Sequence, residues 1–301
     1  MKIRRLVIAM TVLMALTVSF SGINPAGAVP TLDPATGPRQ YGIPDYFNTF
    51  NWANSPPLRK FVDGLPLLNP AGQNNLGQYM PVAVPDTTTY PGSDYYEIEM
   101  GQFREQMHSD LPPLAGGGGG TLLRGYRQTN GPNGLAEPFH FLGPLIIADK
   151  NRAVRIKFTN SLPVGVAGDA FIPTDTTIMG SGEFEIDYDP ETKLPIPVTR
   201  GVFTQNRAVL HLHGGRTPWI SDGTPHQWIA PKNENTVYPK GVSVDYVPDM
   251  WFDAAGNTIA SCAGQSTCGV AGATNNPGYG SQTYYWTNEQ SARLMFYHEH
   301  A

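Results

Sequence analysis

The sequence predicts an all-β fold, a β-sandwich of short strands joined by long loops. Its 301 residues include 33 glycines and 28 prolines, and only 15% of the residues are charged. This composition is typical of a turn-rich globular protein rather than of a disordered one. Several short segments alternate apolar and polar residues between turns, and no stretch carries an apolar stripe at helical spacing over a useful length. Together these observations favour a β-sandwich.

The first 28 residues predict a secretory signal peptide. A basic start, "MKIRR", precedes an apolar run over residues 6–20, and "AGA" at residues 26–28 offers a small-residue cleavage site. The run is shorter than the roughly 20 residues that a membrane-spanning helix needs. We therefore expect a secreted or periplasmic protein that is cleaved near Ala28 and has no membrane contact afterwards. An uncleaved anchor is the alternative.

The next segment, residues 29–92, predicts an irregular lead. It is rich in proline, asparagine and glycine and shows no sustained period. The first strand is expected in "YYEIEMGQF" at residues 95–103, where apolar and polar side chains alternate. We place the folded domain, residues 93–301, just after the lead.

Further strands are expected along this domain. "GPLIIADKNRAVRIKFTNSLP" predicts two strands around a tight turn at residues 149–151, and in the second strand Val154, Ile156 and Phe158 share one face. "RAVLHLHGG" predicts another strand. "QTYYWTNEQSARLMFYHEHA" predicts a hairpin that turns at "NEQS".

Charge and cysteine content narrow the class of partner. The formal net charge is -5 and the basic residues after the N-terminus are scattered, so no basic face for nucleic acid is expected. Cys262 and Cys268 are the two cysteines. Export permits a disulfide between them that would close a small loop. Two free thiols, or two metal ligands, are the alternatives.

Two His-x-His triplets predict a metal site. They are His211 with His213 in "HLHGG", and His298 with His300 in "HEHA". On a strand, residues two apart point to the same face, with their Cβ atoms roughly 7 Å apart. Imidazole nitrogens bind zinc, copper, iron and nickel. Four histidines suit either one mononuclear site or two neighbouring metals, and spacing alone does not choose between them.

The wider context resembles the multicopper oxidase family. "HLHGGRTPWISDGTPHQW" and "LMFYHEHA" resemble the first two of the family's four copper-binding motifs, and "GPLIIADKNRAVRIKFTNSLP" resembles its early strand pair. The likeness covers about residues 95–301. It implies a cupredoxin-like Greek-key β-sandwich. It also implies that His211 binds a type 2 copper, that His213 and His298 share one type 3 copper, and that His300 binds the other.

The resemblance also implies an activity. In the family, this trinuclear copper cluster reduces O2 to water with four electrons that a type 1 copper takes from a small-molecule or metal-ion reductant. Asp222 stands nine positions after His213, where the family often carries an acidic residue, and we expect it to relay protons to the cluster. Alternatively, it only begins an Asp-Gly turn.

The remaining histidines and Glu299 receive other interpretations. We expect His108 and His140 to be structural or surface residues. We assign no site role to His226, although it follows the "HLHGG" loop closely. Glu299 lies between two expected ligands but on the opposite strand face, so we expect it to orient or pack rather than to bind metal.

Half of the family's copper ligands are not in this sequence. The type 1 copper ligands and four further histidines are missing, and the sandwich would lack its closing strand. We expect the N-terminal part of a longer oxidase, inactive alone, whose partner is a C-terminal cupredoxin domain. The alternatives are a secreted copper-binding module without turnover, a mononuclear metalloenzyme of cupin type, and a zinc site of the carbonic anhydrase kind.

Overall fold

The computed structural model describes residues 47–48, 55–90, 92–114, 119–172, 174–175, 177–178, 180–242, 251–252, 258–259 and 277–301. The predicted signal peptide and both cysteines lie outside the described residues. Within the described part, no helix has the length and apolar character needed to cross a membrane. Arg59–Ala301 form one compact unit, and every element below belongs to it.

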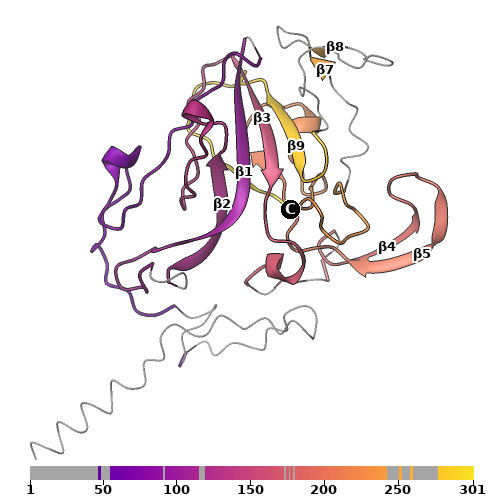
Figure 1. Cartoon of the computed structure of the whole chain (residues 1–301), viewed down its shortest axis with the longest axis horizontal. Helices are drawn as coiled ribbons and strands as arrows, with labels where there is room; N and C mark the ends of the chain where they lie inside the picture. The colour runs from indigo at the N-terminus through magenta and orange to yellow at the C-terminus, as the bar shows by residue number, and fades with distance from the viewer. Residues whose placement is uncertain are drawn as a thin grey trace, which may run out of the picture. The chain divides into compact units, whose positions relative to one another are not determined.

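A four-stranded sheet forms the first layer of the fold (Figure 1). Its strands, in spatial order, are β2 (Thr121–Gln128), β1 (Ser93–Glu105), β3 (Ala153–Asn160) and β9 (Ser281–Trp286). The β1 strand pairs antiparallel with β2 and parallel with β3, and β3 pairs antiparallel with β9. The strands expected around residues 95–103 and 154–159 are thereby confirmed.

The core lies on one face of this sheet. Val154, Ile156 and Phe158 of β3 are buried, as their alternation predicts. The ring of Phe158 packs near the rings of Tyr126 in β2 and Tyr284 in β9. The same apolar cluster includes residues of the second layer, so its packing holds the two layers together.

The second layer contains a pair of short antiparallel strands, β6 (Leu210–Leu212) and β10 (Tyr297–Glu299). The predicted hairpin between β9 and β10 is wrong, because β9 pairs with β3 in the first layer whereas β10 pairs with β6. Alternate side chains of β9, including the buried Tyr284 and Trp286, fill the core from the first layer. The chain between β9 and β10 therefore crosses from one layer to the other.

The prediction of a strand just before the turn at residues 149–151 is also wrong. Only one isolated bridge, between Leu145 and Val82, forms there. The turn itself is present, since the Arg152 amide donates a hydrogen bond to the Asp149 carbonyl at 3.1 Å. Within the lead, residues 55–90 contain one short helix and isolated bridges.

The other described elements are short. They are the strand pairs β4 (Glu183–Tyr188) with β5 (Pro195–Val202) and β7 (Trp251–Phe252) with β8 (Thr258–Ile259), and the 3-10 helices η1 (Pro70–Gly72), η2 (Pro132–Gly134), η3 (Gly165–Gly168) and η4 (Trp219–Ser221). No α-helix occurs among the described residues. The predicted all-β class is confirmed, and the two-layer arrangement fits a cupredoxin-like sandwich.

Candidate metal centre

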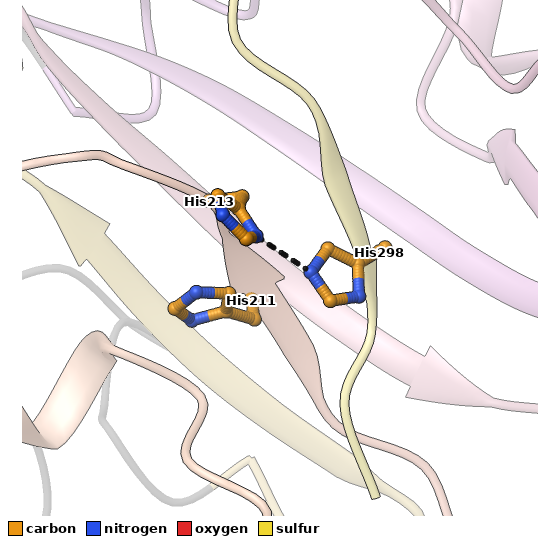
Figure 2. Close-up of side chains that lie close together, drawn as sticks. All are labelled: His211, His213 and His298. Atoms are coloured by element: carbon orange, nitrogen blue, oxygen red, sulfur yellow. Dashed lines mark hydrogen bonds between the residues drawn. The ribbon is translucent and has the colours of Figure 1, made fainter.

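The β6–β10 pair brings the four predicted histidines together. In this pair His298 lies directly opposite His211, and Figure 2 shows His211, His213 and His298 converging from the two strands. The centroid of the His211 ring lies 5.7 Å from that of His213, 5.5 Å from that of His298 and 4.3 Å from that of His300. Two triplets that are far apart in the sequence thus form one cluster of imidazoles.

The strand alternation of β6 explains which way the histidines face. Leu210 and Leu212 are buried in the core. Because successive side chains on a strand point to opposite faces, His211 and His213 face away from the core. The pairing extends beyond β6, since the amide of His213 donates to the carbonyl of Phe296 at 2.9 Å. The Phe296 ring stacks on the His213 ring with 4.5 Å between centroids.

Two consecutive carbonyl groups orient one imidazole from each triplet. The Nδ1 of His211 donates to the carbonyl of Asp222 at 2.5 Å, and the Nδ1 of His300 donates to that of Gly223 at 2.8 Å. A histidine that donates from Nδ1 keeps the lone pair on Nε2 for a metal, and such outer hydrogen bonds fix the ring. The turn after η4 therefore leaves the Nε2 atoms of both rings available to bind a metal.

His213 and His298 face each other through different nitrogens. The Nδ1 of His213 lies 3.3 Å from the Nε2 of His298, as the dashed line in Figure 2 marks. The Nδ1 of His298 donates to the carbonyl of Glu299 at 2.7 Å, which leaves its Nε2 as an acceptor. Without a metal, His213 must therefore carry its proton on Nδ1 and donate it to His298.

The separation of these two nitrogens also suits a shared metal ion. Two imidazole nitrogens about 2.0–2.1 Å from one ion at a tetrahedral angle lie about 3.3–3.4 Å apart, close to the 3.3 Å that joins His213 to His298. One nitrogen from each of His211, His213 and His298 lies within 4.8 Å of the other two. His300 stands outside this group of three, stacked on His211 with an interplanar angle of 23°. The donor set and its spacing fit metal binding.

Asp222 lies beside the cluster and is open to solvent. Its carboxylate accepts a hydrogen bond from the Thr217 hydroxyl at 2.9 Å, and the nearest carboxylate oxygen is 3.8 Å from the Nδ1 of His211. The side chain is 38% exposed. It lines an open recess of about 360 Å³, together with Thr217 and Glu289. Asp222 also caps the C-terminus of η4 before Gly223, so the turn that the sequence predicts as its alternative role is present.

Glu299 does not join the ligands and instead bonds to backbone. Its carboxylate accepts hydrogen bonds from the amides of Val209, His300 and Ala301. Burial raises the pKa of Glu299 to about 7, although these amide hydrogen bonds act in the opposite direction. This placement agrees with the expectation of an orienting residue.

The other histidines lie elsewhere. His108 contacts the carbonyl of Arg59 at 2.9 Å, and His140 contacts the buried carboxylate of Glu105 at 3.0 Å. Both are structural, as expected. His226 is exposed. Sequence reasoning missed the carbonyls that orient His211 and His300, and their signal was the glycine of "SDG", which permits the close turn.

The described fold and site define a β-sandwich protein with a cluster of histidines that could bind a metal. No family model matches the chain. The sequence is 28% identical over 247 residues to a laccase of Bacillus subtilis and 28% identical over 244 residues to a laccase of Bacillus stratosphericus. It is also 28% identical over 183 residues to a laccase of Haloferax volcanii. These matches cover 81%, 81% and 60% of this chain.

These relatives relate the chain to the multicopper oxidase family, a family of copper-containing oxidoreductases. The resemblance seen in the histidine motifs is thereby confirmed. The chain spans only 30% of the length of the two Bacillus laccases and 23% of the Haloferax one.

Proposed function

We propose that this chain is the N-terminal part of a secreted multicopper oxidase. The complete enzyme would couple one-electron oxidation of a reductant to the four-electron reduction of O2 to water. The observation that carries this proposal is the convergence of two His-x-His pairs on one face of β6 and β10, with three of the four rings oriented by backbone carbonyls. The laccase relatives support the choice of copper.

The four histidines would supply half of a trinuclear copper site. His211 would serve the type 2 copper, His213 and His298 one type 3 copper, and His300 the other. The facing nitrogens of His213 and His298 support the shared ligand pair. When bound, the copper ions would supply the redox chemistry, and the chain's own contribution is to hold the ligand nitrogens in place through its backbone carbonyls.

Asp222 would hold and pass protons at its carboxylate. Oxygen reduction consumes protons, and a carboxylate within reach of both solvent and the ligands is suited to deliver them. The exposed recess on one side and His211 on the other support this role. In the complete enzyme, Asp222→Asn should slow O2 reduction while the copper content stays unchanged. Unchanged turnover would exclude the relay.

The remaining ligands would come from a C-terminal cupredoxin domain. His213 is exposed, and the neighbouring Phe296 and Leu294 are 59% and 90% exposed, a surface that suits coverage by another domain. The reductant would be a small molecule or a metal ion, oxidised at the type 1 copper of that domain. Signal-directed export would place the enzyme outside the cytoplasm.

Copper titration of the purified chain tests the proposal. We expect copper to bind through histidine nitrogens, and His298→Ala should weaken that binding at least tenfold because His298 faces both His211 and His213. The matched control is His108→Ala, which removes a histidine outside the cluster. The chain alone should consume no O2 with a phenolic reductant. Equal copper binding by both variants and the wild type would contradict the assignment.

A second function is supported by a separate observation. The compact group of His211, His213 and His298 would also suit a mononuclear centre, either in a copper-binding module without turnover or in a cupin-type enzyme. The stoichiometry separates the two functions. One tightly bound ion per chain, with no O2 consumption even in the complete protein, would favour the mononuclear centre.

A further inference from the structure

We propose that Glu299 is a positioning residue, whose carboxylate fixes the backbone of His300 against β6 and so sets the geometry of the metal ligands. This inference rests on the proposed copper site but concerns a residue that binds no metal itself. It assigns the "HEH" sequence a role for its middle residue as well as for its two histidines.

The hydrogen bonds of Glu299 join two segments that carry ligands. Its Oε1 accepts from the amides of Val209 at 3.0 Å, His300 at 3.0 Å and Ala301 at 2.8 Å, and its Oε2 lies 3.2 Å from the Val209 amide. Val209 immediately precedes β6, whereas His300 and Ala301 follow β10. One side chain therefore bridges the start of one ligand strand and the end of the other.

These contacts lie where the strand pairing alone would fray. The β6–β10 register ends with Glu299 opposite Leu210, so His300 has no partner within this described ladder. His300 is instead held at two points, by its amide on Glu299 and by its Nδ1 on the carbonyl of Gly223. With both points fixed, the imidazole stacks on His211 at 4.3 Å. Without the hydrogen bond to Glu299, the backbone of His300 would be released and only its ring would stay held.

A carboxylate suits this position because all the facing groups are donors. The carboxylate oxygens accept hydrogen bonds from all three amides. A glutamine that kept its oxygen at the Oε1 position would place its NH2 group where Oε2 now faces the Val209 amide at 3.2 Å, so two donors would meet there. Partner groups that orient metal ligands typically contribute about 10- to 100-fold in metal affinity. We expect Glu299→Gln to weaken copper binding by a factor in that range.

The experiment compares Glu299→Gln with Glu105→Gln in the full chain. Glu105 is a matched control, because it is a buried carboxylate at the end of a strand that accepts bonds from a histidine and from the Phe141 amide. Copper affinity is measured by competition with a chelator, copper coordination by electron paramagnetic resonance, and folding by thermal melting. Glu299→Gln should weaken copper binding and alter the resonance spectrum. Glu105→Gln should lower the melting temperature without either effect.

Glu299→Asp is a second variant that tests the inference even if Glu299→Gln fails to fold. It keeps an acceptor-only group on a shorter stem, so we expect copper affinity between those of the wild type and Glu299→Gln. The inference is overturned if Glu299→Gln binds copper as tightly as the wild type, or if Glu105→Gln weakens binding equally. If the wild type binds no copper, the proposed function fails instead. The role of Glu299 would then be judged from the imidazole resonances of His300 in the metal-free chain, which Glu299→Gln should shift and Glu105→Gln should not.

Discussion

The turn at Gly223 offers a direct test of how the ligands are oriented. Gly223 has a φ of 68°, and a Cβ placed there would collide with the carbonyl group of Leu210, 2.7 Å from its carbon, and would lie 3.1 Å from the Cα of His211. Both neighbours are backbone atoms of β6, so no side-chain rotation relieves the clash. In Gly223→Ala the turn must move away from β6.

The magnitude follows from the contacts that this movement breaks. An alanine at positive φ costs about 1 kcal/mol. The displaced turn would also lose the hydrogen bonds from His211 to Asp222 and from His300 to Gly223, at about 1 kcal/mol each. We expect Gly223→Ala to lower the free energy of unfolding by about 3 kcal/mol or more. Copper affinity should fall by about 10- to 100-fold, because both rings lose their orienting carbonyls.

Chemical denaturation and copper titration measure these two quantities, and Gly165→Ala provides the control. Gly165 has a φ of 62°, and a Cβ placed there would have nothing within 4 Å. This variant should therefore show the conformational cost alone, about 1 kcal/mol. Equal destabilisation by the two variants, or unaltered copper affinity in Gly223→Ala, would refute the reasoning.

Three further results are expected. First, copper binding should move the proton of His213 from Nδ1 to Nε2 while His211 keeps its proton on Nδ1, a change that nitrogen-15 spectra of the imidazoles report; a fixed His213 tautomer would contradict the ligand assignment. Second, partial burial opposes ionisation of Asp86, but hydrogen bonds from Thr88 and Thr89 outweigh it and hold the pKa of Asp86 below its ordinary value of 3.8. The stability that this carboxylate contributes is present above about pH 3.8 and is lost at lower pH, so wild type and Asp86→Asn should converge in melting temperature as the pH falls; a constant difference would exclude the linkage. Third, Phe158→Ala empties a fully buried site in the central strand and should lower the free energy of unfolding by about 3–5 kcal/mol in denaturation experiments.

Strand positions were predictable from the sequence where apolar and polar residues alternate and the apolar side chains are buried on one face of the strand. In β3, Val154, Ile156 and Phe158 alternate with more polar residues, and this pattern alone places the strand. Which strands pair with each other was harder to predict from the sequence. The pairing of β9 with β3 rather than with β10 depends on packing across the core, which a local turn signal such as "NEQS" does not contain.

The candidate site was likewise only partly predictable from the sequence. Residue type and spacing identified His211, His213, His298 and His300, because two His-x-His triplets are informative in themselves. The orienting groups are backbone carbonyls and amides, which nearly every residue carries, so no side-chain pattern marks them. The folded turn at Gly223 brings two such carbonyls within reach of the His211 and His300 rings.

The distance in sequence between the two ligand strands has a consequence for the order of folding. His213 and His298 are 85 residues apart, and the first layer supplies the surface on which β6 is buried. Closing so long a loop before it gains native contacts is entropically unfavourable, so pairings of this kind form late. We therefore expect the metal centre to assemble after the four-stranded sheet. A copper ion that recognises the converged rings would bind only chains that have completed this last step, and so would mark the end of folding rather than guide its beginning.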